Sequence, residues 1–133
     1  MNSKRKLIII ALIAAAILSI TLLANAEPTD ENLEYIPTKM TVTGTTVKIQ
    51  GYFVNHNGFP VGDLEDFHLY IYENGELIVD AYFGDLGYFE VDANGRYTFN
   101  FTIKDVHGLK RGSYNCGLYD ITADFECTYS YWK

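Results

Sequence analysis

The sequence predicts an all-β fold, an antiparallel β-sandwich of about seven strands preceded by a helical signal peptide. All 20 aromatic residues lie beyond residue 26, and eleven of them are tyrosines. Aromatic and β-branched residues favour strands over helices. Apolar and polar residues alternate in several short segments, as in strands with one buried face. Turn residues separate these segments at intervals typical of a sandwich.

The first 26 residues have the pattern of a secretory signal peptide. Basic residues at positions 4–6 precede an apolar run over 7–24, and Ala24-Asn25-Ala26 supplies the small residues that signal peptidase requires. We therefore expect cleavage after Ala26 and a secreted, extracellular chain of 107 residues. The alternative is an uncleaved anchor, but the run is slightly short for a spanning helix, which needs about 20 apolar residues.

The charge of the mature chain excludes two classes of partner. Cleavage would remove three of the ten Lys and Arg residues and none of the 17 Asp and Glu residues, leaving a formal net charge of −10. Phosphate backbones and anionic lipid surfaces repel such a chain. We expect no nucleic-acid binding and no membrane association after cleavage.

The mature chain divides into a short flexible segment and one domain. Residues 27–39 contain Pro28, Pro37 and four acidic residues but few large apolar ones, so we expect a poorly ordered segment. The sandwich domain is predicted over 40–133. Its first clear strand is 47–54, in which Gly51 marks a weak point or a bulge.

The middle of the domain is predicted from its turns. The segment 55–60 has the composition of a turn, and an acidic loop with Asp63, Glu65 and Asp66 precedes a strand over 67–72. Asn74-Gly75 and Asn94-Gly95 are each predicted to form a two-residue hairpin turn, because type I′ turns need positive φ at both central residues. The second hairpin would join 88–91 to a strand over 97–104.

The last predicted hairpin pairs 114–119 with 125–129 and contains both cysteines of the chain. In the simplest register Cys116 lies opposite Cys127, on the buried face. In an oxidising compartment such a pair is expected to form a disulfide. A redox or metal-binding pair is the alternative, but such sites usually show two-residue spacing or a neighbouring His, and both are missing here.

One segment resembles immunoglobulin domains. Gly112-Ser113-Tyr114-Asn115-Cys116 is similar to their sixth strand, where a Tyr two residues before a Cys forms the tyrosine corner. The turn segments 92–97 and 109–114 also resemble those of bacterial secreted immunoglobulin-like modules. The chain departs from the family by having Gly51 where the early Cys belongs and no Trp on the third strand. The resemblance covers about the last half of the chain and implies an immunoglobulin-like β-sandwich, with little indication of function.

The sequence contains no recognisable catalytic set. His56, His68 and His107 are scattered and are interpreted as surface residues rather than as ligands, and no Ser lies in a Gly-x-Ser-x-Gly elbow. The carboxylates at 63–66 fit no EF-hand spacing. We therefore expect a non-enzymatic protein without a cofactor or a metal.

Aromatic side chains on one sheet face form the candidate binding face. If Phe67, Leu69 and Ile71 point inward, the residues between them point outward. The third, sixth and seventh strands of an immunoglobulin-like sandwich lie side by side. The predicted face is His68, Tyr70, Tyr72, Tyr119 and Trp132.

Such a face favours a binding module for a protein or cell-envelope partner, because exposed aromatic patches often mark binding surfaces. A carbohydrate-binding module, with Tyr70, Tyr72 and Trp132 stacking on sugar rings, is the alternative. A secreted hydrolase inhibitor has less support, and cross-strand stabilisation of the sheet would also explain the aromatic residues.

Overall fold

The computed structural model describes residues 32–131, and of residues 129–131 it describes the backbone. The predicted signal peptide, residues 27–31 and Trp132 lie outside this range. The described chain forms two antiparallel sheets packed together, which confirms the predicted all-β sandwich. No helix that is both long and apolar enough to cross a membrane occurs within this range.

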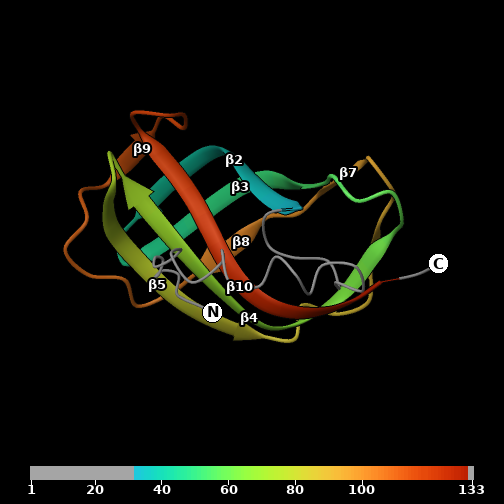
Figure 1. Ribbon diagram of the computed structural model, residues 1–133. Coiled ribbons are helices and arrows are strands. Elements are labelled where there is room, and N and C mark those ends of the chain that lie inside the picture. The colour runs from blue at the N-terminus through green and yellow to red at the C-terminus, as the bar shows by residue number, and fades with distance from the viewer. Residues whose placement is uncertain (1–31, 132–133) are drawn as a thin grey trace, which may run out of the picture.

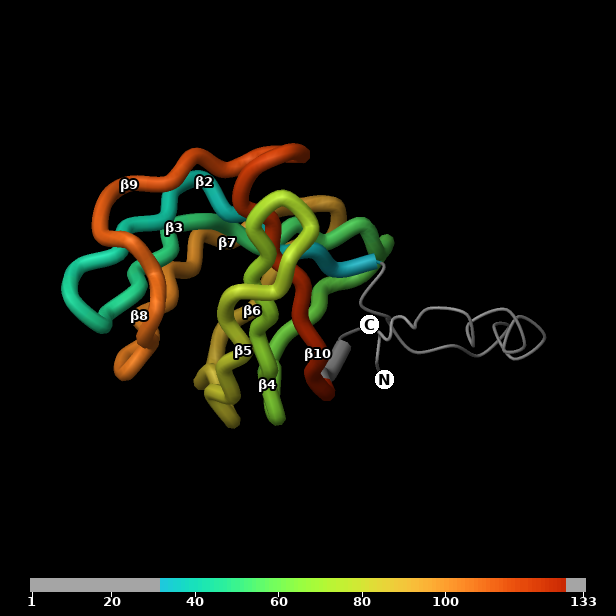
Figure 2. Tube along the Cα trace, turned by 90° about the vertical axis from the view of Figure 1, so that its left-hand side faces the viewer, coloured from blue at the N-terminus to red at the C-terminus, as the bar shows by residue number. Residues whose placement is uncertain are grey.

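Nine strands are formed by the described residues, compared with the predicted seven or so. One sheet has the order β10–β4–β5, with β6 also paired to β4, and the other has the order β7–β3–β2–β9, with β8 paired to β3. Figures 1 and 2 show the two layers from views 90° apart. The bounds are β2 Leu33–Thr43, β3 Thr46–Asn55, β4 Val61–Glu73, β5 Glu76–Gly84, β6 Glu90–Val91, β7 Arg96–Thr98, β8 Phe101–Ile103, β9 Gly112–Tyr114 and β10 Ile121–Tyr131.

Residues 27–39 were predicted to be a poorly ordered segment. This prediction is wrong from residue 33 onward, because β2 begins at Leu33. Leu33 and Tyr35 are buried and alternate with the exposed Glu34, so this stretch has the period of a half-buried strand. Pro37 is tolerated next to an irregularity in the pairing of β2 with β3. The prolines and acidic residues are typical of a loop, but burial of Leu33 and Tyr35 in the tertiary structure stabilises a strand here.

Of the two Asn-Gly turns, the first forms the predicted hairpin. Asn74 (φ 49°) and Gly75 (φ 85°) join β4 to β5. The second turn does not join paired strands, because β6 pairs with β4 whereas β7 pairs with β3 in the other sheet. Asn94 has a φ of 56°, but Gly95 is not among the residues with positive φ, so the type I′ geometry is absent and the chain crosses between sheets.

The acidic segment 63–66, predicted as a loop, belongs to β4. Asp63 (φ 53°) and Asp66 (φ 50°) take left-handed backbone conformations, which Asp adopts more readily than most residues. Leu64 between them is fully buried. The strand therefore starts at Val61, six residues earlier than the alternation indicated.

The predicted C-terminal hairpin is wrong, and so is the predicted disulfide. β9 pairs with β2 and β10 pairs with β4, so the two segments lie in different sheets. Cys116 forms an isolated bridge with Ile121, six positions before Cys127 on the same strand. Six strand residues span about 20 Å, whereas bridged cysteines have Cα atoms less than about 7 Å apart. Cys116 and Cys127 are accordingly not bonded to each other.

Aromatic rings fill the space between the sheets. Phe53 of β3 lies edge-on to Phe67 of β4, with 5.9 Å between the ring centroids. Phe67 in turn stacks on Phe125 of β10, with 5.0 Å between centroids and an interplanar angle of 16°. All three side chains are at most 2% exposed. These contacts join the sheets, and each aromatic pair contributes about 0.5–1.5 kcal/mol beyond its buried area.

Gly51 lies where β2, β3 and the segment between β7 and β8 meet. The ring of Tyr35 covers this glycine, and the Tyr35 hydroxyl donates to the carbonyl of Phe99 at 2.6 Å. The Gly51 carbonyl accepts from the amide of Phe99 at 3.0 Å, while its amide donates to the side chain of Asn100 at 3.4 Å. β3 itself runs unbroken through Gly51, and the register shift opposite it lies in β2, between Pro37 and Lys39. The predicted strand 97–104 is interrupted between β7 and β8, which pair with β3 in one register.

Candidate binding surface

The outer face of the β10–β4–β5 sheet carries three of the five predicted site residues. His68, Tyr70 and Tyr72 on β4 are partly exposed and alternate with fully buried apolar residues. Tyr119 is not on this face but in the loop before β10. Trp132, the fifth residue, lies outside the described range.

The strands beside β4 differ from those predicted. The third, sixth and seventh strands were expected side by side, but β9 lies in the other sheet, and β10 and β5 flank β4. Each of the three site residues has one partner on β10 and one on β5. On β10, Glu126 lies opposite His68, Asp124 opposite Tyr70 and Thr122 opposite Tyr72. On β5, the corresponding partners are Tyr82, Asp80 and Leu77. Carboxylates therefore surround the aromatic residues of β4.

His68 is held at the centre of this face by three neighbours. Its ring stacks on Tyr70, with 4.7 Å between centroids and an interplanar angle of 9°. Tyr82 meets the same ring edge-on at 6.0 Å, and Nε2 contacts the carboxylate of Asp80. His68 is thus a partly exposed residue on the solvent side of β4, where it contacts Tyr70, Tyr82 and Asp80.

Two tyrosine hydroxyls are anchored by carboxylates. Tyr70 donates to Oε1 of Glu126 and Tyr82 donates to Oδ1 of Asp66, each at 3.0 Å. Burial, followed by the bond to Glu126, raises the pKa of Tyr70 well above its ordinary value. The bond to Asp66 likewise raises the pKa of Tyr82. Both hydroxyls stay protonated at neutral pH, and these bonds fix the ring orientations.

We name this surface the acidic aromatic face. It consists of His68, Tyr70, Tyr72, Tyr82, Asp66, Asp80 and Glu126. The loop before β10 is tied to the turn at the Tyr72 end of β4, where the carbonyl of Asp120 accepts from the amide of Asn74 at 2.9 Å. In that loop Leu118 and Tyr119 are 79% and 77% exposed.

Charge is distributed unevenly between the two sheets. β4, β5 and β10 contain eight Asp or Glu residues and neither Lys nor Arg. The described Lys and Arg residues lie on the other sheet or in its loops: Lys39, Lys48, Arg96, Lys104, Lys110 and Arg111. The acidic aromatic face therefore carries a negative potential, which attracts cationic groups.

The chemical groups of this face are imidazole, phenol and carboxylate side chains. His68 contacts Asp80 and lies opposite Glu126 on the outer face of the sheet. Among residues 32–128 no group of three His, Cys, Asp or Glu side chains is placed to hold a metal ion. Burial, reinforced by Asp120, raises the pKa of the Cys116 thiol, so this cysteine is a poor nucleophile at neutral pH.

Asp66, Asp80 and Tyr82 were not predicted to belong to this face. The available signal was the hairpin turn at Asn74-Gly75, which places β5 beside β4. An irregularity between Ile71 and Tyr72 shifts the register, however, so that Tyr70 faces Asp80 rather than Val79. Without this shift, the hairpin would put the opposite set of β5 side chains outward.

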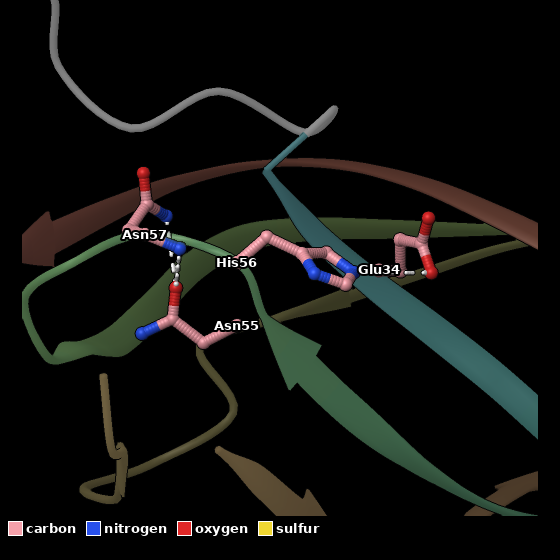
Figure 3. A network of polar contacts seen from close by, with 4 residues as sticks. All are labelled: Glu34, Asn55, His56 and Asn57. Atoms are coloured by element: carbon pink, nitrogen blue, oxygen red, sulfur yellow. Dashed lines mark hydrogen bonds and ion pairs between the residues drawn. The ribbon is translucent and has the colours of Figure 1, made fainter. Parts of the chain in front are cut away.

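A buried asparagine pair, Asn55 and Asn57, lies at the C-terminal end of β3 and in the loop that follows it (Figure 3). Asn55, fully buried, accepts from both the amide and the side chain of Asn57, at 2.8 and 2.9 Å. Its own Nδ2 donates to the carbonyls of Phe59, Val91 and Asp92. Beside it, the exposed His56 lies 3.6 Å from Glu34 of β2. These bonds of Asn55 join β3 to the following loop and to β6, so the role of this side chain is structural.

No protein-family model, curated protein or solved structure matches the chain. The fold and the surface described above define an antiparallel β-sandwich protein with an acidic aromatic outer sheet face.

Proposed function

We propose that this protein is a secreted, non-enzymatic immunoglobulin-like module that binds a protein partner through the acidic aromatic face. The observation that carries the proposal is the arrangement of rings held in place by carboxylates on a sheet without Lys or Arg. A partner segment containing Lys or Arg complements it, since such cations interact with both carboxylates and the faces of aromatic rings. Side chains already fixed in position lose little entropy on binding.

The ring geometry favours a protein over a carbohydrate. A sugar-binding platform needs a ring face that lies open to solvent. The faces of His68 and Tyr70 stack against each other at 4.7 Å, and Tyr82 meets His68 edge-on. Such a packed cluster resembles the aromatic and charged centre of a protein interface more than a stacking platform.

A tyrosine corner supports the immunoglobulin-like assignment. The hydroxyl of Tyr114 donates to the carbonyl of Lys110 at 2.6 Å, four residues upstream, which is the bond expected of that motif. The position of β9 beside β2 departs from the immunoglobulin arrangement. The proposed relationship therefore concerns the corner and the sandwich architecture.

Secretion gives a direct prediction. Protein recovered from the culture medium is expected to begin at Glu27, because Ala24 and Ala26 provide the cleavage signal. N-terminal sequencing measures this. Recovery of the full-length chain in the membrane fraction would show instead that the apolar run is an anchor.

The binding proposal is tested by replacing Tyr70 and Tyr72 together with Ser. A partner is first isolated from an envelope extract of the source cells, and its affinity is then measured by calorimetry. We expect the double variant to bind about 30-fold more weakly, the equivalent of roughly 2 kcal/mol for buried aromatic anchors. Its free energy of unfolding should fall by only about 1–2 kcal/mol, since each cross-strand pair contributes about 0.2–1 kcal/mol.

Tyr88→Ser is the matched control, because Tyr88 is 95% exposed and lies outside the acidic aromatic face. This variant should bind like the native protein. Asp80→Asn should weaken binding and reduce its salt dependence, because it removes one charge from the face. Unchanged affinity in the Tyr70→Ser/Tyr72→Ser protein would refute this surface as the binding site.

A further inference from the structure

A groove of about 460 Å³ lies beside β5, which is the outermost strand of the β10–β4–β5 sheet. Six consecutive residues of β5, 78–83, line one wall. Residues 102–106, from β8 and the loop after it, line the other wall, so the two walls belong to different sheets. Among the described residues, no strand pairs with β5 on its outer side.

The pairing of β10 with β4 shows which backbone groups of β5 point into this groove. Both backbone groups of Ile121 bond away from β4: its amide donates to the carbonyl of Asn115 at 3.1 Å, and its carbonyl accepts from the amide of Gly117 at 3.0 Å. Four residues further along, the amide of Phe125 donates to the side chain of Asp124 at 2.8 Å. The register with β4 is unbroken over this stretch, so the odd-numbered residues of β10 form non-bonded pairs with β4.

The odd-numbered residues 69–73 of β4 therefore bond to β5 instead. Leu69, opposite Phe125, bonds to its other partner, Ala81. Bonding directions alternate along a strand, so Asp80 and Tyr82 direct their N–H and C=O groups away from β4 and toward the groove. Both residues are exposed, the side chain of Asp80 to 54% and Tyr82 to 63%. β5 thus presents two donors and two acceptors with the repeat of a strand.

Two irregularities limit this bonding stretch to four residues. Ile78 and Phe83 are extra residues in the pairing of β5 with β4, one on each side of the regular stretch 79–82. Such bulges protect an edge strand against long pairing with another sheet edge. The short stretch between them faces a wall that includes the apolar side chains of Ile103 and Val106. This geometry fits a short extended segment better than the edge of a second sandwich.

The charge around this edge favours a basic segment. β4, β5 and β10 contain eight Asp or Glu residues and neither Lys nor Arg, and the charges of Lys104 and Asp105 on the other wall cancel. The side chains of Asp80 and Tyr82 belong to the acidic aromatic face. Residues opposite them in an added strand point to the same side, so basic residues there meet carboxylates. A second copy of the chain would bring two acidic sheets together.

We infer that the outer edge of β5 binds an extended basic segment of the protein partner, which adds a strand alongside residues 79–82. Backbone bonds to Asp80 and Tyr82 set its register, because a row of donors and acceptors with a strand repeat is complementary to another extended backbone. Its basic side chains lie at the acidic aromatic face, and the alternate apolar ones face Ile103 and Val106. The inference deepens the proposed function and rests on it for the basic chemistry of the segment.

Amide hydrogen exchange of the mature protein tests the inference directly. The probe is an acetylated and amidated hexapeptide of alternating Lys and Val. In the free protein, the amides of Asp80 and Tyr82 should exchange at least about tenfold faster than those of Val79 and Ala81, which are bonded to β4. Saturating peptide should slow exchange at Asp80 and Tyr82 by at least about tenfold and leave the amide of Tyr88, outside the groove, unchanged.

Two N-methylated peptides provide the matched control. One carries N-methyl groups on its Lys residues and the other on its Val residues, so only one of them loses donors to β5. Strand addition predicts that only this peptide loses affinity, by at least about tenfold. A loss at the Lys set indicates antiparallel addition, because the residue opposite Asp80 then donates to it, and a loss at the Val set indicates parallel addition.

Three results would overturn the inference. Equal affinity of the two methylated peptides would exclude backbone pairing. Slow exchange of Asp80 and Tyr82 in the free protein would show that the edge is already covered, and protection that grows with protein concentration without peptide would assign it to a second copy.

The Tyr70→Ser/Tyr72→Ser protein separates this inference from the proposed function. If that variant loses the partner while the partner leaves the amides of Asp80 and Tyr82 unprotected in the native protein, the acidic aromatic face binds without strand addition and only this inference fails. If the variant keeps its affinity and the two amides are protected, the edge of β5 is the site and the proposed face is refuted.

Discussion

Asn55→Ala is expected to destabilise the protein by about 3–5 kcal/mol, because it leaves buried carbonyls without their donor. The polar side-chain atoms of Asn55 are hydrogen-bonded within the protein. Its Nδ2 donates to the carbonyls of Phe59, Val91 and Asp92, and its Oδ1 accepts from the amide of Asn57. Domains of this size have stabilities of about 5–15 kcal/mol. Thermal unfolding should therefore show a Tm lower by roughly 15–25 °C.

Asn55→Asp separates hydrogen bonding from packing, since the two side chains have nearly the same shape. The carboxylate would face the same carbonyls without a donor, so this variant should be less stable than Asn55→Ala at neutral pH. Asn115, an exposed asparagine, provides the control, and Asn115→Ala should change stability by less than about 0.5 kcal/mol. A loss below about 1 kcal/mol for Asn55→Ala would show that water or backbone movement satisfies the carbonyls.

Gly51→Ala should cost about 3 kcal/mol, because the added methyl has no room. A Cβ at this position would overlap the backbone carbonyl oxygen of Ile36 and lie 2.7 Å from the hydroxyl of Tyr35. The neighbouring strand or the Tyr35 ring would have to move, and either movement disturbs the bond from Tyr35 to Phe99. Chemical denaturation measures the loss as a lower midpoint at an unchanged slope.

Gly58→Ala is the matched control for this substitution. A Cβ at Gly58 meets no atom within 4 Å, and its φ lies outside the left-handed region. This variant should therefore be neutral within about 0.5 kcal/mol. If Gly51→Ala were equally neutral, β2 would have to shift outward at its irregularity near Pro37 without loss of packing.

Local chemistry determined the strand content and one hairpin. Alternation of apolar and polar residues predicted the buried face of β4, and Phe67, Leu69 and Ile71 are all fully buried. The Asn74-Gly75 pair predicted the β4–β5 turn because few other dipeptides adopt two positive φ angles. The outward direction of His68, Tyr70 and Tyr72 followed from the same alternation.

Pairing between distant segments could not be predicted in this way. An alternating segment carries the same pattern whichever sheet it joins, so the segments around Cys116 and Cys127 were compatible with a hairpin. The structure places β9 against β2 and β10 against β4, which removes the predicted disulfide. The strand at Leu33 was missed for a related reason, since its stability comes from burial under the other sheet rather than from its composition.

The sequence by itself determined an all-β chain, its turns and the outward aromatic residues of β4, because these depend on side-chain period and on backbone preferences of single residues. The tertiary structure alone decided which residues surround that aromatic row. A one-residue shift in the pairing of β4 with β5 brings Asp80 and Tyr82 to His68, and the choice of β10 as neighbour brings Glu126 to Tyr70. Register and strand order are settled by packing over the whole sandwich, since each one-residue slip turns every side chain of a strand to the other face.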